Sequence, residues 1–197
     1  MVVELQEIAR YMRMGRTVPE GALAARVIAL REEALKAIRP ARVWRRFPIA
    51  NAAIASGGVR LAIGGTLARH LAGCPAAYLA GGTIGAGFDA FQRRVSVSSG
   101  ADALIAQAIG AALIEKLMDA VEEEIRAELA ADETLVSRYS PGYGDFPLEA
   151  QRTVLTLLDA PLKAGISLTD TLLMVPSKSV SAIIGVRGGR QGEVHGR

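Results

Sequence analysis

The run from Arg138 to Pro147 combines the residue types best suited to hold a small ligand. Pro141 presets φ for the second position of a turn, and Gly142 supplies the positive φ that a type II turn needs at the third. Such a turn would hold Arg138 and Tyr143 in a fixed relation. A guanidinium offers a planar fork to a carboxylate or phosphate, and a tyrosine ring offers an apolar face with a polar tip. The run predicts a loop site for a ligand that is part anionic and part aromatic.

Two other polar features have both a functional and a plain structural interpretation. The segment Pro176-Ser177-Lys178-Ser179 interrupts apolar sequence, and it also fits an ordinary hairpin loop. Glu115 and Asp119 are one helical turn apart, so their carboxylates would share a helix face. Such pairs are usually solvated, and a paired general acid and base would need burial to separate their pKa values. Both interpretations stay open at this point.

Ordinary catalytic and metal chemistry finds little support in the sequence. His70 and His195 are the only histidines, and neither has a second His or Cys at metal-ligand spacing. No G-x-S-x-G elbow or Walker-type loop occurs. Cys74 is the single cysteine, which excludes an intramolecular disulfide and favours a reducing compartment. We therefore predict no catalytic residue and no metal site, and we favour a binding role.

The glycine-rich run Gly81–Gly87 resembles a dinucleotide-binding loop only superficially. It follows a predicted strand and precedes a predicted helix, but its spacing is not G-x-G-x-x-G. No acidic residue closes a following strand. Tight packing of a strand against a helix is the favoured interpretation, and a dinucleotide-dependent enzyme is the least favoured class of function.

Composition places the chain among globular proteins. Half of the 197 residues are hydrophobic and the formal net charge is only +3, so nucleic-acid binding is not demanded. No apolar run reaches membrane-spanning length, and residues 1–14 lack the apolar stretch of a signal peptide. We expect a cytoplasmic protein with no membrane partner, made of a single domain over residues 1–186 and a flexible basic tail over 187–197.

Apolar periodicity predicts an α+β domain. The expected helices are 2–14, one that follows a Thr17–Glu20 capping box and stops at Pro40, 66–71, one ending near Arg94, 101–132 and 148–158. The expected strands are 43–49, where Pro48 indicates a sheet edge or a strand end, 59–63, 76–80, and a closing hairpin of 171–175 and 179–186. On the longest helix, Leu104 and Leu117 are among the expected inward positions, and Gly110 marks a close crossing. Its acidic run Glu122–Glu124, with Glu128, reads as a solvated face without function.

Two motifs in the last third of the chain resemble a known family. Arg138-Tyr139-Ser140-Pro141-Gly142-Tyr143 is similar to the R-x-x-x-G-Y motif of the activation domain of cobalamin-dependent methionine synthase. The segment 172–182 is similar to the M-x-P-x-x-S-V-S motif of that domain. Two motifs in the right order and at the right separation are more specific than either alone. The form Gly144–Leu148 is closer to the free-standing version of the domain.

The resemblance implies a fold and a set of binding residues. The fold would be a mostly antiparallel twisted sheet with helices, one of them long and central. Arg138 would take the carboxylate of S-adenosylmethionine, while Ser140, Gly142 and Tyr143 would shape the adenosyl site. Glu115 aligns with a ligand-facing glutamate on the long helix. The family match also implies that Lys178 and Ser179 face the cobalamin side.

The implied function is reactivation within methionine biosynthesis. The chain would present S-adenosylmethionine to a cobalamin-binding methyltransferase, and an electron donor such as a flavodoxin or ferredoxin would reduce the oxidised cobalamin held by that partner. A sulfonium methyl group is already activated, so no general base is needed and the chain is not expected to catalyse a reaction alone. The alternative is a binding module of the same fold that serves another corrinoid protein or another adenosyl ligand.

Overall fold

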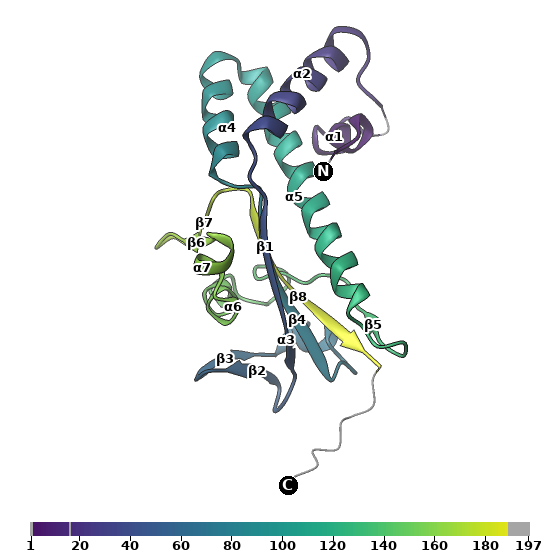
Figure 1. Ribbon diagram of the computed structural model, residues 1–197, viewed down its shortest axis with the longest axis vertical. Coiled ribbons are helices and arrows are strands. Elements are labelled where there is room, and N and C mark those ends of the chain that lie inside the picture. Colours follow the sequence, from purple (N-terminus) through teal and green to yellow (C-terminus); the bar gives the residue numbers. More distant parts are fainter. Residues whose placement is uncertain (1, 16, 189–197) are drawn as a thin grey trace.

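The computed structural model of this chain describes residues 2–15 and 17–188. Helices gather at one end and a sheet lies at the other, and the long helix α5 joins the two (Figure 1). The helices are α1 (Leu5–Tyr11), α2 (Gly21–Ala37), α3 (Gly65–His70), α4 (Ala86–Ser98), α5 (Gly100–Ala127), α6 (Ala150–Leu158) and α7 (Ala160–Ala164). The strands are β1 (Ala41–Pro48), β2 (Ala53–Ser56), β3 (Val59–Ala62), β4 (Ala76–Thr83), β5 (Thr134–Leu135), β6 (Ser167–Leu168), β7 (Met174–Val175) and β8 (Ser179–Arg187).

The main sheet is antiparallel, with strand order β1-β4-β8-β5. Strand β4 is buried along its whole length, and β1, which ends at Pro48, is an edge strand as predicted. On the far side of β8, β5 pairs only with Arg187 and Val186. An isolated bridge joins Tyr139 to Ile183. The beginning of β8, residues 179–181, therefore has an open edge.

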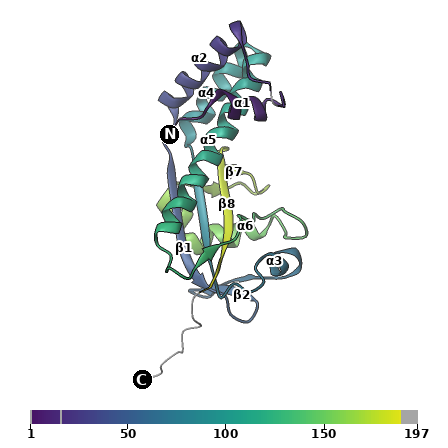
Figure 2. The same cartoon turned by 90° about the vertical axis from the view of Figure 1, so that its right-hand side faces the viewer.

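Different helices cover the two faces of this sheet (Figure 1). Side chains of β4 and β8 alternate between them, because successive residues of a strand point to opposite faces. Ile184 packs with Met118 and Val121 of α5, whereas Ile183 packs with Val154 of α6. Each such fully buried aliphatic side chain stabilises the fold by about 1.5–3 kcal/mol. Seen from the α5 side, α1, α2 and α4 surround the first half of α5 and form a separate apolar cluster (Figure 2).

The α+β class and the long helix are confirmed. Helix α5 runs over 28 residues and is capped by Ser99, whose hydroxyl accepts from the Asp102 N–H at 3.2 Å. The close crossing at Gly110 is also confirmed, because a Cβ there would lie 2.5 Å from the Phe88 ring. Leu104, in contrast, is 72% exposed, and the buried face begins at Ile105.

The predicted C-terminal hairpin is wrong. Strand β7 pairs with β6, which the sequence did not reveal, and β8 pairs with β4 inside the main sheet. Val175–Pro176 is a cis peptide bond at the turn between β7 and β8. Two-residue strands such as β6 are too short to produce an alternating pattern, so the pairing is set by tertiary contacts.

Two predictions about local structure near the first half of the chain need correction. The predicted Thr17–Glu20 capping box does not form, because α2 begins at Gly21 with Glu20 as its N-cap and without a side-chain cap. Gly81 and Gly82 lie within β4 and not in a loop, and a Cβ on Gly82 would meet Met118 Sδ at 2.8 Å. Close packing of the strand against α5, the favoured interpretation, explains Gly82, whereas a Cβ on Gly81 would make only ordinary contacts at 3.6–3.7 Å.

The sequence indicated that the acidic end of α5 is only a solvated face, and this interpretation is wrong. The Glu124 carboxylate accepts two hydrogen bonds from Arg42, at 2.7 and 3.0 Å. Glu128 accepts from the Trp44 indole at 3.0 Å and from the Tyr78 hydroxyl at 3.3 Å. The run therefore ties α5 to β1 and β4. Glu122 belongs to the site described below.

The predicted tail falls mostly on residues 189–197, which lie outside the described residues, while Arg187 belongs to β8. The proposed domain end at residue 186 stays a prediction. In the part of the chain that the structure describes, no helix is both long and apolar enough to cross a membrane.

Candidate functional site

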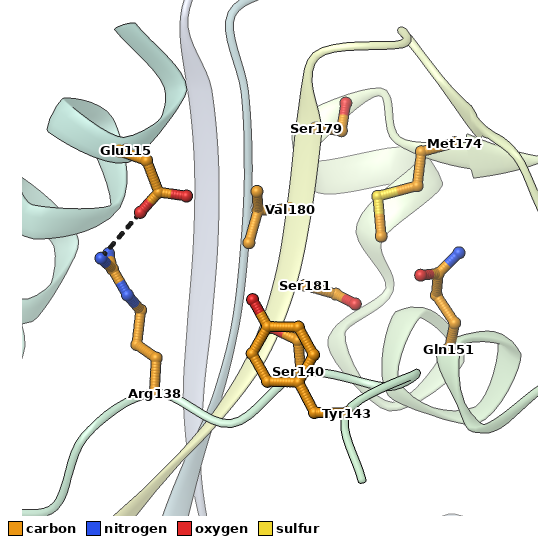
Figure 3. A pocket seen from close by; sticks show the side chains of 9 residues that line it. All are labelled: Glu115, Arg138, Ser140, Tyr143, Gln151, Met174, Ser179, Val180 and Ser181. Atoms are coloured by element: carbon orange, nitrogen blue, oxygen red, sulfur yellow. Dashed lines mark hydrogen bonds and ion pairs between the residues drawn. The ribbon is translucent and has the colours of Figure 1, made fainter. Parts of the chain in front are cut away.

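A pocket of about 360 Å³ lies at the open edge of β8, between α5 and the segment that leads into α6 (Figure 3). Its walls come from α5, the loop 138–143, α6, β7 and β8. The lining residues are Glu115, Arg138, Ser140, Tyr143, Gln151, Met174, Ser179, Val180 and Ser181. Both motifs identified in the sequence thus contribute to one pocket.

The loop that bears Arg138 is a type II turn, as predicted. The Tyr143 N–H donates to the Ser140 carbonyl at 3.2 Å, and Gly142 at the third position has φ +91°. A second bond, from the Gly142 N–H to the Phe146 carbonyl at 2.9 Å, closes the loop on itself. Gly142 shapes the backbone without lining the pocket, whereas Ser140 and Tyr143 line it.

Contacts outside the pocket hold this loop in place. Tyr139 exchanges main-chain bonds with Ile183 at 2.8 and 2.9 Å, and its hydroxyl donates to Thr66 Oγ1 at 2.7 Å. The Asp145 carboxylate accepts from the Thr66 N–H at 2.8 Å and also from its hydroxyl. These hydrogen bonds from Thr66 hold the pKa of the Asp145 carboxyl below its usual value. Tyr139 also stacks on His70, at 4.8 Å between ring centroids, so it anchors the loop.

The Arg138 guanidinium is bound by carboxylates of α5. Its Nη2 donates to Glu115 and Asp119, each at 3.0 Å, and its Nε lies 3.0 Å from Glu122 Oε1. The fork that we expected to be free for a ligand is therefore largely occupied. Its Nη1 is buried and has no hydrogen-bond partner among the described residues.

The cluster around Arg138 carries more negative than positive charge. Three carboxylates face one guanidinium, and among the described residues only Glu122 has a second cationic contact, with Arg126 at 3.0 Å. Glu115 and Asp119 keep 39% and 56% of their side-chain surface exposed. This wall of the pocket suits a ligand with a cationic group, and Nη1 is left for an anionic one.

The two residues predicted to face cobalamin point in different directions. Ser179 lines the pocket, and its hydroxyl donates to the Pro176 carbonyl at 2.6 Å. Lys178 does not line this pocket. Its Cε would lie 2.8 Å from a Cβ on Gly110 of α5, and burial lowers the pKa of its amine, with Asp89 partly opposing the shift. Lys178 lies in the bend that precedes β8, whereas Ser179 is the first residue of the strand.

Four lining residues were not among the predicted site residues: Gln151, Met174, Val180 and Ser181. Three of them, Met174, Val180 and Ser181, lie in the second motif, so the motif itself contained the signal for them. Gln151 had another signal, because it shares a helix face with the buried Val154 and Leu158. A polar residue on the buried face of an amphipathic helix needs a partner, which makes it a site candidate.

Comparisons with known proteins agree with this geometry. The family model "Vitamin B12 dependent methionine synthase, activation domain" matches residues 78–188, a stretch that includes both motifs and every lining residue. No curated protein sequence matches this chain.

Similarity to a solved structure supports the fold independently. A crystal structure of the MetH reactivation domain bound to AdoHcy has a TM-score of 0.59 with 15% sequence identity. The alignment covers 96% of this chain and 76% of that one. At this identity the likeness shows a shared fold. The family model, in turn, matches more than half of the 197 residues. The chain therefore belongs to the family of vitamin B12-dependent methionine synthase activation domains.

Proposed function

We propose that the pocket at the open edge of β8 binds S-adenosylmethionine, and that the chain acts in the cytoplasm as a reactivation subunit for a cobalamin-dependent methyltransferase of the methionine synthase type. One observation carries the proposal. Residues of both motifs, Arg138, Tyr143 and Ser179, line a single pocket although the motifs lie far apart in sequence. The MetH reactivation domain, which shares the fold, was crystallised with AdoHcy, an adenosyl ligand of the same class.

The residues of the pocket suit the charged end of this ligand. S-adenosylmethionine carries an ammonium, a sulfonium and a carboxylate. The Glu115 carboxylate lines the pocket and can attract the cationic groups, and the unpartnered Arg138 Nη1 can donate to the ligand carboxylate. The Tyr143 ring, 59% exposed, offers a face on which the adenine can stack.

The chemistry asks little of the chain beyond positioning. In the transfer, the bond between carbon and sulfur breaks with its electron pair staying on sulfur, and the electron pair of reduced cobalt forms the new bond to the methyl carbon. The products are methylcobalamin and S-adenosylhomocysteine. The cobalamin belongs to the methyltransferase partner, and a flavodoxin or ferredoxin supplies the electron. Orienting the methyl group and excluding water are sufficient tasks for the pocket.

Isothermal titration calorimetry of the native chain with S-adenosylmethionine tests the binding step. We expect saturable binding at one site per chain, with an affinity that falls as salt is added, because part of the attraction is electrostatic. Absence of binding by the folded chain would reject the proposal.

The alternative is a module of this fold that serves another corrinoid protein or another adenosyl ligand. The discriminating assay mixes the chain, S-adenosylmethionine, a chemical reductant and the cobalamin-loaded methyltransferase, and follows methylcobalamin by its absorbance. Formation of methylcobalamin supports reactivation, whereas docking without methyl transfer favours the alternative.

A further inference from the structure

Ser181 is a buried polar residue whose role the motif-based assignment leaves unexplained. Its side chain is 2% exposed, and its Oγ has no hydrogen-bond partner among residues 2–15 and 17–188. An unsatisfied buried hydroxyl costs free energy, so native proteins rarely keep one without a reason. Because Ser181 lines the pocket, a ligand is the natural source of the missing partner.

Gln151 reaches the same part of the pocket from α6. Its Nε2 donates to the Leu172 carbonyl at 3.0 Å. A carbonyl can only accept, so this bond fixes the orientation of the amide and leaves Oε1 to the pocket. Figure 3 shows the Ser181 hydroxyl and the Gln151 amide oxygen pointing toward one another across the pocket. None of the described residues donates to Oε1.

The carbonyl that orients Gln151 is held by a strained turn. Leu172 has φ +65°, a conformation that residues with a side chain seldom adopt. Thr169 secures the turn, because its carbonyl accepts from the Leu172 N–H at 3.1 Å and its hydroxyl from the Leu173 N–H at 3.0 Å. Strain of this kind persists where the surrounding structure enforces it, often beside a ligand site.

The main chain of Ser181 also faces the open edge of the sheet. Ile183, two residues along β8, exchanges both of its main-chain bonds with Tyr139 on that edge. In an antiparallel strand, alternate residues direct these groups to the same side, so those of Ser181 point there too. Strand β5 does not extend this far along β8. Side-chain and main-chain groups of one residue thus converge on the pocket.

We propose that Ser181 and Gln151 form a subsite that selects the nucleoside part of the ligand. Gln151 Oε1 can only accept a hydrogen bond, and Ser181 Oγ can donate or accept. The group that satisfies both must donate a hydrogen bond to Oε1 and form a second hydrogen bond with Oγ, as donor or as acceptor. On an adenosyl ligand this chemistry is found in a ribose hydroxyl and in the amino edge of adenine. The inference rests on the proposed function, whose pocket it subdivides.

Calorimetry with the full chain and a set of analogues tests the subsite. The parent probe is S-adenosylhomocysteine, which is stable in solution. One analogue replaces the adenine amino group with oxygen (S-inosylhomocysteine), and two others lack the ribose 2′- or 3′-hydroxyl. For the native chain, we expect one of these changes to weaken binding about tenfold, the usual effect of leaving buried polar groups unpaired. The analogue affected identifies the group.

The variant Ser181→Ala should bind the parent probe about tenfold more weakly and should no longer discriminate against the affected analogue. Gln151→Leu, which removes the facing acceptor from another element, should cause the same loss of discrimination. Ser98→Ala is the matched control, because the Ser98 hydroxyl donates to Val95 on α4, away from the pocket. The thermal unfolding of each variant reports whether it is folded.

The possible outcomes separate this inference from the function on which it rests. If folded Ser181→Ala and Gln151→Leu discriminate against the affected analogue as strongly as the native chain does, the subsite is overturned while adenosyl binding stands. Equal binding of all the analogues by the native chain would overturn it as well. If the native chain binds no adenosyl compound, both the subsite and the proposed function fall.

Discussion

Helix α5 binds Arg26 near its beginning and Arg138 in its second half, and the two sites differ in their balance of charge. Arg26 donates twice to Asp102, at 2.5 and 2.9 Å, in a pair of one cation and one anion. Arg138 meets three carboxylates, those of Glu115, Asp119 and Glu122. The charges of Arg26 and Asp102 balance each other, and the pair holds α2 against α5. An excess of carboxylates beside an open pocket, together with an unpartnered Arg138 Nη1, is suited to a charged ligand.

Replacing Arg138 should have the largest effect on ligand binding. Arg138→Ala removes the donor to the ligand carboxylate and leaves three carboxylates facing one another, so affinity for S-adenosylmethionine should fall by about thirtyfold or more, on the order of 2 kcal/mol. Calorimetry measures the change. The affinity of Arg138→Lys should lie between those of the native chain and Arg138→Ala, because an ammonium keeps the charge but lacks the planar fork.

Arg26→Ala is the matched control for that experiment. It breaks an arginine–carboxylate contact to the same helix but away from the pocket, so it should leave the dissociation constant unchanged. Equal losses of affinity in Arg138→Ala and Arg26→Ala would mean that both arginines act only on the fold and that Arg138 does not contact the ligand.

The close crossing of α5 and α4 can be disrupted at Gly110, which packs against Phe88. Gly110→Ala places a Cβ 2.5 Å from Phe88 and 2.8 Å from Lys178 Cε, so overpacking should cost about 1–3 kcal/mol of unfolding free energy. Gly100→Ala, on the same helix, has no atom within 4 Å of the new Cβ and should be neutral or slightly stabilising. Urea denaturation of the two variants gives the difference, and similar values would argue against a close crossing.

The Arg26–Asp102 pair should affect stability and not binding. Arg26→Ala leaves the Asp102 carboxylate, which is 12% exposed, without its cation, and the melting temperature should fall by a few degrees. Arg94→Ala, which breaks an exposed pair with Glu33, should have almost no effect. Differential scanning fluorimetry provides the test, and equal shifts would show that burial does not distinguish the pairs.

Acid should modestly lower the folding stability that Asp102 and Asp145 contribute at the two ends of the molecule. The Asp102 pKa is lowered by Arg26 and the Asp145 pKa by Thr66, so each carboxylate has a folded pKa below its unfolded value of about 3.9. Their contribution to stability is complete above about pH 4 and is lost as the pH falls through the folded pKa values. Asp145→Asn should flatten part of this dependence in melting curves between pH 5 and pH 2, about the range over which paired carboxylates protonate. An unchanged profile would contradict the role assigned to Thr66.

Regular periodicity and local turn chemistry could be read from the sequence. The apolar stripe of α5, the edge position of Pro48 and the type II turn at Ser140–Tyr143 are local patterns, and the structure confirms them. The strand pairings were not local. Strand β8 pairs with β4, almost a hundred residues earlier, and nothing in residues 171–186 alone distinguishes this from a hairpin.

The candidate site could be predicted in part for the same reason. Arg138, Ser140, Tyr143 and Ser179 were identified from motifs, and they share the pocket with Glu115. The binding of Arg138 by Glu122 was missed, because a run of glutamates on a helix usually faces water and only the tertiary structure brings the arginine to it. Lys178 lies outside the pocket that Ser179 lines, and its predicted position facing cobalamin stays a prediction.

A crystal structure of the chain with S-adenosylhomocysteine would test the central claim most directly. The account predicts the ligand along the open edge of β8, with its carboxylate within hydrogen-bond distance of Arg138 Nη1 and its nucleoside beside Ser181. A ligand bound elsewhere, with the Arg138 cluster and Ser181 unchanged, would contradict it.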